Sequence, residues 1–201
     1  SPPGNLPDTF GTNDIVADDD GAIYLWLPDG EYAFTANGRL CTTEIKNGSG
    51  PSGVTVNGGD AAFGPDDPAT AGWAYDLATC TLTLSGAGPY TLAGTNRNGK
   101  VCVVVPAGVT NTVTLSNLAL ATTNDNQCAF ALENNACVSL VLAGTNTLAS
   151  GKYRAGLEVA AGRTLSITNA PGDGAAALFA TGGFDAAGIG GGSGTKGFIG
   201  N

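Results

Sequence analysis

The sequence contains no histidine and no methionine, and charged residues make up only 12% of its 201 residues. Without histidine, the Ser-His-Asp and Cys-His nucleophilic sites are excluded, together with most zinc chemistry. No apolar run approaches the roughly 20 residues that a membrane-spanning helix needs. We therefore expect none of these catalytic mechanisms and no insertion into a membrane.

Basic residues are also few, with eight Lys and Arg against 17 Asp and Glu, for a formal net charge of −9. The imbalance lies in residues 1–67, which carry eleven acids and two bases, whereas residues 68–201 carry six of each. Binding to phosphate groups depends on clustered Lys and Arg. Nucleic acids and anionic membrane surfaces are therefore not expected as partners.

Glycine is abundant, with 32 residues, and Thr, Asn, Ser and Ala are frequent, which favours strands and turns over helices. From about Trp73 onward the sequence repeats. The string LAGTN at 92–96 returns at 142–146, and TLS at 83–85 returns at 114–116 and 164–166. The repeating unit is roughly 25 to 31 residues and holds short alternating strands between Gly and Asn turns. This pattern predicts an all-β fold, a parallel β-helix (solenoid) of stacked coils.

The repeat also predicts which side chains stack inside the coils. Val105, Leu132 and Val159 are equally spaced along the chain and are expected to form one inward ladder. The same alignment places Cys102 and Cys128 one coil apart and one residue out of register, which weakens the case for a disulfide between them. The five cysteines leave structural thiols or one or two disulfides open, and their pairing is not determined: Cys41, Cys80, Cys102, Cys128 and Cys137.

The chain is expected to have four parts. Residues 1–20 form an acidic, proline-containing leader, and residues 21–50 form a small antiparallel β-meander with strands at 23–27, 32–35 and 40–45 around a turn at Asn37-Gly38. Residues 51–72 form a linker that begins in a Gly-, Ser- and Pro-rich joint. Residues 73–201 form the coils of the β-helix. The meander is too small to be stable alone.

Several segments resemble the repetitive surface proteins of gut and environmental bacteria. The segments are GWAYD at 72–76, TLTLSG at 81–86, LAGTNTL at 142–148, RAGL at 154–157 and AGIGGG at 187–192. The modules of those proteins are described as carbohydrate-binding domain-containing and are right-handed parallel β-helices. The resemblance implies a right-handed β-helix, an extracellular or bacterial cell-surface location, and roles in adhesion and glycan binding.

One feature departs from that family. There the AGIGGG element usually begins another series of coils, whereas this sequence ends at Asn201, about ten residues after it. We therefore expect a C-terminal coil that is cut or open, in a fragment of something longer or in a subunit that stacks on another copy. Such stacking would involve the apolar and glycine residues near this end: Ile189, Gly190, Phe198 and Ile199.

The carboxylates of the predicted β-helix are scattered among turns, with no adjacent pair: Asp76, Asp125, Glu133, Glu158, Asp173 and Asp185. A polysaccharide lyase or hydrolase would need them clustered, so we predict a protein without enzymatic activity. No cofactor is expected except calcium, for which the leader and linker offer candidate ligands at Asp18, Asp19, Asp20, Asp66 and Asp67. The alternative for these residues is a solvated linker.

A basic and aromatic group is the candidate ligand site. Gly99-Lys100 and Gly151-Lys152 lie at equivalent positions of the repeat, so their cations are expected along one edge, with an aromatic ring available to stack on a sugar. The candidate residues are Arg97, Lys100, Lys152, Tyr153 and Arg154. The alternative is that charge is simply tolerated at the corners of the coils.

These observations favour a non-catalytic surface module, an adhesin stalk or a glycan-binding domain. The alternative is a subunit of an extracellular fibre that stacks end to end through open coils, and a polysaccharide lyase or hydrolase is less favoured. The expected partners are a glycan or other copies of the chain.

Overall fold

The structure is a computed structural model that describes residues 15–17, 23–25, 36–37, 42–43, 52–65, 67–96, 99–122 and 124–193. The chain divides into two compact units, Ser1–Gly50 and Pro51–Asn201. The described residues are mostly in β-strands, and many of the strand pairs are parallel. The prediction of an all-β protein with parallel strands is confirmed at this level.

The first unit contains two short antiparallel pairs. Strand β1 (Ile15–Ala17) pairs with β2 (Ile23–Leu25), and β3 (Ala36–Asn37) pairs with β4 (Thr42–Thr43). Strand β1 falls in the segment expected to be a leader, and Asn37, expected in a turn, is instead paired with Thr42. The predicted strand at 32–35 lies outside the described residues.

The second unit is built on two sheets. One has six strands in the spatial order β18 (Ile189–Gly190), β15 (Leu157–Glu158), β12 (Phe130–Leu132), β10 (Cys102–Val105), β8 (Thr81–Leu84) and β7 (Trp73–Asp76). The other follows the order β16 (Thr164–Asn169), β13 (Cys137–Ala143), β11 (Thr110–Ala121), β9 (Tyr90–Thr95), β5 (Val54–Val56) and β6 (Gly59–Asp60). Strands β14 (Thr145–Ala149) and β17 (Ala177–Thr181) extend it beside β11.

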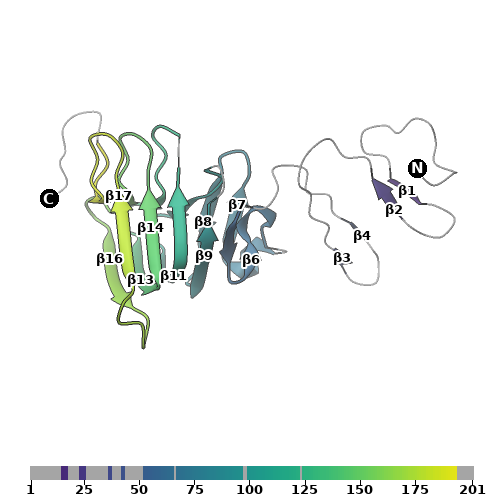
Figure 1. The fold of residues 1–201 in the computed structure, drawn as a ribbon, viewed down its shortest axis with the longest axis horizontal. Helices are drawn as coiled ribbons and strands as arrows, with labels where there is room; N and C mark the ends of the chain where they lie inside the picture. The colour runs from purple at the N-terminus through teal and green to yellow at the C-terminus, as the bar shows by residue number, and fades with distance from the viewer. Residues whose placement is uncertain are drawn as a thin grey trace. The chain divides into compact units, whose positions relative to one another are not determined.

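From β8 onward the chain passes back and forth between these sheets. Each time it returns to a sheet, the new strand lies parallel to and beside the strand that the chain last formed there. Successive strands therefore lie in chain order across the unit, from blue to yellow in Figure 1. Val105 pairs with Leu132, and the same step along the sequence separates the paired residues of β11 and β13 and those of β13 and β16. The predicted spacing and this rung of the predicted ladder are confirmed.

The core consists of ladders of apolar side chains between the sheets. One ladder runs through Leu82, Val103, Phe130 and Leu157, which pair in register and are all 0% exposed. Burying each such side chain contributes roughly 1.5–3 kcal/mol. Trp73, expected to be buried, is 7% exposed. The alternation of buried and less buried residues along β8 and β13 is the period of two that the sequence predicted.

A β-bulge interrupts the long strand β11 between Ser116 and Leu118. Asn117, at the bulge, has φ 51°, and Gly144, one layer later, has φ 65°. A Cβ atom at Gly144 would lie 2.2 Å from Asn117 Oδ1, so the position requires glycine. The bulge thus accounts for one glycine of the LAGTN repeat.

At the N-terminal end of the stack, the first parallel strands are covered by antiparallel ones, because β7 pairs with β8 and β5 pairs with β9. Residues 51–72, expected to be a linker, supply much of this cover through β5, β6, a 3-10 turn at Ala61–Phe63 and helix α1 (Pro68–Ala71). The linker prediction is wrong because this segment buries apolar side chains, with Val54 and Ala61 0% exposed. The Asp60 carboxylate also fixes it, accepting hydrogen bonds from the backbone of Ser52 and Gly53.

The C-terminal end is different. Among the described residues, no strand pairs with the outer edges of β16, β17 and β18. The ladders end there on exposed side chains. Ile167 is 40% exposed although its partner Leu140 is 0% exposed, and Ile189 is 48% exposed although its partner Leu157 is 0% exposed. Within the part of the chain that the structure describes, the two ends of the stack are therefore unlike.

Candidate functional site

The predicted cations of the 152–154 segment are held in ion pairs with neighbouring carboxylates. Lys152 Nζ lies 3.2 Å from Asp125 Oδ2, and both side chains are more than half exposed, at 58% and 53%. Arg154 Nε lies 2.9 Å from Glu158 Oε2, but the N–H is not aligned as a hydrogen bond. The Glu158 side chain is only 11% exposed, so this pair is the more shielded of the two. Both pairs reduce the net charge of this edge.

Tyr153 belongs to an exposed aromatic pair that the sequence did not reveal. Its ring centroid lies 6.3 Å from that of Phe184, with the rings at 85° to each other. The backbone N–H of Tyr153 also donates to the Phe184 carbonyl, at 3.1 Å. Tyr153 is 40% exposed and Phe184 is 65% exposed. The loops that precede β15 and β18 therefore present two aromatic rings to solvent.

The other two members of the predicted site are less well defined. Lys100 lies just before β10, and Lys152 lies in the loop before β15. Strand β12 lies between β10 and β15 in the sheet, which is the two-layer separation that the repeat predicted. The Lys100 carbonyl accepts a hydrogen bond from the Tyr75 hydroxyl at 2.5 Å. Arg97 lies outside the described residues.

The carboxylates of the second unit are used for internal contacts. Asp76 accepts from the Ala78 backbone N–H and the Thr79 hydroxyl, both at 2.9 Å, and these bonds hold its pKa below the usual value. Glu133 accepts from the Ala107 N–H at 3.3 Å.

Asp173 accepts from the Gly144 N–H at 2.6 Å, and Asp185 has a left-handed backbone, φ 57°. In the part of the chain that the structure describes, no three His, Cys, Asp or Glu side chains are grouped as metal ligands would be.

Asp67, one of the predicted calcium ligands, caps helix α1. Its carboxylate accepts from the Ala69 N–H at 3.0 Å and from the Thr70 hydroxyl at 2.5 Å. These hydrogen bonds, led by that of Thr70, lower the pKa of Asp67. The remaining candidate ligands lie outside the described residues: Asp18, Asp19, Asp20 and Asp66.

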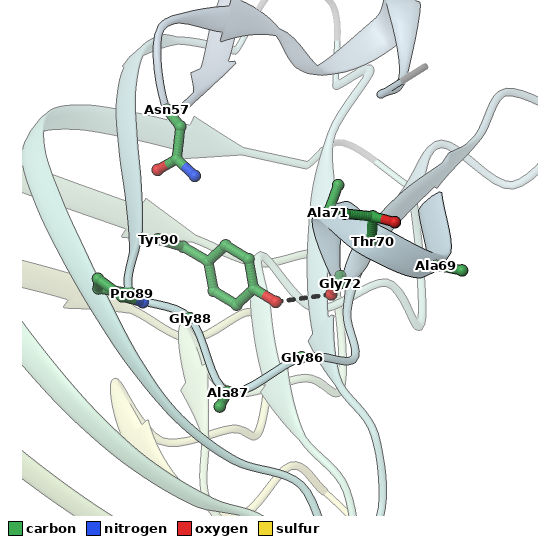
Figure 2. A pocket seen from close by; sticks show the side chains of 10 residues that line it. All are labelled: Asn57, Ala69, Thr70, Ala71, Gly72, Gly86, Ala87, Gly88, Pro89 and Tyr90. Atoms are coloured by element: carbon green, nitrogen blue, oxygen red, sulfur yellow. Dashed lines mark hydrogen bonds between the residues drawn. The ribbon is translucent and has the colours of Figure 1, made fainter. Parts of the chain in front are cut away.

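A hollow of about 340 Å³ lies at the covered end of the stack, between the α1 region and the loop before β9. Figure 2 shows Tyr90 reaching across it, and the Tyr90 hydroxyl donates to the Gly72 carbonyl at 2.6 Å. Its lining contains no Asp, Glu, Lys or Arg: Asn57, Ala69, Thr70, Ala71, Gly72, Gly86, Ala87, Gly88, Pro89 and Tyr90. Burial raises the pKa of Tyr90. The hollow therefore offers hydrogen-bonding groups but no acid or base that titrates near neutral pH.

Two asparagines of the LAGTN repeat hold the backbone of adjacent layers together. Asn146 is 0% exposed, and its Oδ1 accepts from the Leu118 N–H at 2.9 Å. Asn96 Nδ2 donates to the carbonyls of Val101 at 2.8 Å and Ala121 at 3.0 Å. The repeat was visible in the sequence, but the buried role of its last residue was not. The signal that could have revealed this role is that an asparagine recurs at the same position of the repeat, at Asn96 and Asn146.

The four described cysteines are free thiols: Cys80, Cys102, Cys128 and Cys137. Cys41 lies outside the described residues. Cys128 is 6% exposed and its Sγ donates to the carbonyls of Ala155 at 3.0 Å and Phe130 at 3.1 Å. Burial raises the pKa of this thiol. The structure has no disulfide between Cys102 and Cys128.

Of the residues expected at a self-association surface, Ile189 and Gly190 form β18 at the uncovered end. Phe198 and Ile199 lie outside the described residues. None of the described helices is both long and apolar enough to cross a membrane.

Comparisons with protein-family models, with curated proteins and with solved structures found no match.

Proposed function

We propose that the chain is a non-catalytic module of an extracellular or cell-surface protein, a right-handed parallel β-helix that serves as an adhesin stalk and binds glycan at one loop edge. The same step of 27 residues recurs in both sheets, between β10 and β12, between β11 and β13 and between β13 and β16, and this recurrence supports the β-helix. Connections between parallel strands of one sheet are right-handed in about 98% of cases, which supports the hand. The acidic balance and the resemblance to bacterial surface modules support the location.

The observation that carries the glycan proposal is the exposed pair of Tyr153 and Phe184. Aromatic rings that remain partly in solvent provide flat apolar faces against which the C–H face of a sugar ring can pack. Lys152 and Arg154 are the sequence neighbours of Tyr153, but each already has a carboxylate partner, at 3.2 and 2.9 Å. The edge therefore favours a neutral sugar over a highly charged one.

The internal use of the carboxylates supports a non-catalytic role. Hydrolysis of a glycosidic bond generally needs a pair of carboxyl groups flanking the scissile bond. In the described part of the chain, Asp125 and Glu158 are instead engaged with Lys152 and Arg154, and Asp173 with a backbone amide. The lyase or hydrolase alternative gains no support from this arrangement.

The test is binding of the full chain to a panel of neutral and acidic polysaccharides, measured by affinity electrophoresis and calorimetry. Tyr153→Ala and Phe184→Ala are expected to weaken binding at least about tenfold, since each removes one ring of the platform. Phe179→Ala is the matched control, because Phe179 is 60% exposed but lies in strand β17, outside the two loops. No binding to any polysaccharide, or equal loss in the control, would contradict the proposal.

A second candidate function is self-association through the uncovered C-terminal end. Exposed Ile167 and Ile189 and the unpaired edges of β16, β17 and β18 support it. At the other end β8 and β9 pair with the antiparallel strands β7 and β5, so the two ends of the described sheets present unlike edges and do not match each other. Two copies would therefore join through their like ends and form a pair.

Light scattering after size exclusion, together with negative-stain electron microscopy, tests this candidate. A concentration-dependent dimer is expected, lost in Ile189→Asp and kept in Leu77→Asp, whose side chain is 43% exposed in the turn before β8 at the covered end. A monomer at all concentrations refutes self-association. Filaments would favour the fibre instead.

A further inference from the structure

Two cysteines lie on neighbouring strands at the start of the stack. Cys80 immediately precedes β8, and Cys102 is the first residue of β10, where it pairs with Thr81. Cys80 is thus one residue out of register with Cys102. Strands lie about 4.8 Å apart and rise about 3.3 Å per residue, so this offset gives a Cα separation of roughly 6 Å. That separation falls within the range of about 4.4–6.8 Å that disulfides span.

Hydrogen bonds fix the two residues against each other. The Cys102 backbone N–H donates to the Cys80 carbonyl at 2.9 Å, and the Cys102 thiol donates to the same carbonyl at 3.2 Å. The Cys102 sulfur therefore already lies beside the Cys80 peptide unit. Cys80 has φ 55°, which releases its side chain from the strict alternation of an extended strand. The Cys80 thiol now donates to the Leu77 carbonyl at 3.7 Å, so bond formation requires its side chain to turn away from that carbonyl.

A half-buried phenol, that of Tyr75, lies close to both thiols. The Tyr75 hydroxyl donates to the Lys100 carbonyl at 2.5 Å. Burial raises the pKa of Tyr75, and the thiols of Cys80 and Cys102 both add to that increase. Gln127 Nε2 lies 3.2 Å from the Cys102 sulfur and covers it from the side of the next layer.

We propose that Cys80 and Cys102 are a disulfide-forming pair, oxidised by a small-molecule disulfide such as oxidised glutathione. The Cys80 thiolate attacks one sulfur of the reagent and displaces the first small thiolate. The Cys102 thiolate then attacks the Cys80 sulfur of the mixed disulfide, the new S–S bond forms, and the second small thiolate leaves. Both thiol protons pass to the leaving thiolates, and the two electrons lost by the protein reduce the reagent.

The order of attack follows from exposure. Cys80 is partly exposed and open to a dissolved reagent, whereas Cys102 is 5% exposed and reacts only with a sulfur held beside it. The other described thiols lack such a partner. Cys128 is engaged with the carbonyls of Phe130 and Ala155, and Cys137 lies in β13 of the other sheet. The pair is therefore selective among the described cysteines.

The bond would join the first two layers of the stack next to the covered end. It closes a loop of 22 residues, for which the loss of chain entropy in the unfolded state predicts a rise of roughly 6–12 °C in the melting midpoint. The extracellular location proposed above is an oxidising environment in which such a bond persists. The pairing itself rests only on the register and contacts of the two residues.

The test uses the full chain in a buffer of oxidised and reduced glutathione near pH 8, followed by alkylation of the remaining thiols. Non-reducing tryptic mapping by mass spectrometry separates the two cysteines, because cleavage after Lys100 lies between them. We expect a cross-linked peptide pair in the wild type and in Cys137→Ser. Neither Cys80→Ser nor Cys102→Ser should give it. The melting midpoint should rise on oxidation and fall again with dithiothreitol only in the proteins where the cross-link is present.

Three outcomes overturn the proposal. The wild type could keep all its thiols alkylatable, or it could hold a stable glutathione adduct at Cys80 with no cross-link. A cross-link that persists in Cys80→Ser would assign the bond to another pair. Because serine differs from cysteine by one atom and Cys80 is partly exposed, the Cys80→Ser variant is expected to fold, which its unchanged circular dichroism would verify.

Discussion

The contrast between the two ends of the stack predicts unequal costs for two truncations on one ladder. Leu140 and Ile167 pair in register, but Leu140 is 0% exposed and Ile167 is 40% exposed. Leu140→Ala removes buried methyl groups and leaves an enclosed cavity, which costs about 3–5 kcal/mol. Ile167→Ala leaves no enclosed cavity and removes atoms that already touch water, so its expected cost is about 1 kcal/mol.

Urea unfolding followed by circular dichroism measures both costs as free energies, and thermal unfolding measures them as shifts of the melting midpoint. For a domain of about 150–250 residues, a cost of 1 kcal/mol lowers the melting midpoint by about 2–4 °C. Leu140→Ala should therefore lower the midpoint by about 6–20 °C, and Ile167→Ala by about 2–4 °C. Equal costs would refute the interpretation, because Ile167 would then be covered in the full chain. A cost for Ile167→Ala that grows with protein concentration would identify a second copy as the cover.

Buried polar groups give three more expected outcomes. Asn146→Ala leaves the buried Leu118 N–H without its acceptor, so the free energy of unfolding should fall by about 1–3 kcal/mol in urea, and a change below about 0.5 kcal/mol would refute the role. Burial raises the pKa of Cys102 and Cys128, so the stability that the two thiols contribute is complete below about pH 8.5 and is lost as the pH rises further. The urea midpoints of the wild type at pH 7 and pH 10 should therefore differ more than those of a variant in which both cysteines are serine. An equal difference in the two proteins would contradict this. Burial likewise raises the pKa of Tyr75 and of Tyr90, so ultraviolet titration should find phenols that ionise later than free tyrosine, and one fewer of them in Tyr75→Phe.

The register of the parallel strands could be predicted because the sequence repeats. A constant step along the chain sets Val105 against Leu132. Each layer must place an inward side chain over the one before it, so the period of the sequence and the period of the structure are the same quantity.

The cover at the N-terminal end could not be predicted in this way. Val54 and Val56 lie in a strand of three residues within a glycine-rich stretch, and its partner β9 is far along the chain and antiparallel. No repeat specifies such a pairing, and a short strand of this kind carries little local signal. The composition of the segment therefore favours a linker although the chain folds there.

The candidate site was predictable only in its local part. Tyr153 and its basic neighbours are consecutive in the sequence, whereas Phe184 reaches Tyr153 from the loop of the next layer. The step from Leu157 to its partner Ile189 is longer than the step from Val105 to Leu132, so the repeat does not place Phe184 beside Tyr153. Irregular steps hide contacts that regular ones reveal.

The constant step in the middle of the stack has a consequence for how such a chain changes in length. Each inner layer touches only the layers before and after it, so duplicating or deleting a block of one such step leaves the neighbouring interfaces with the same partners as before. Every such block would lengthen or shorten the two sheets by about 4.8 Å. Duplication or deletion of such blocks would therefore change the length of this unit in fixed increments.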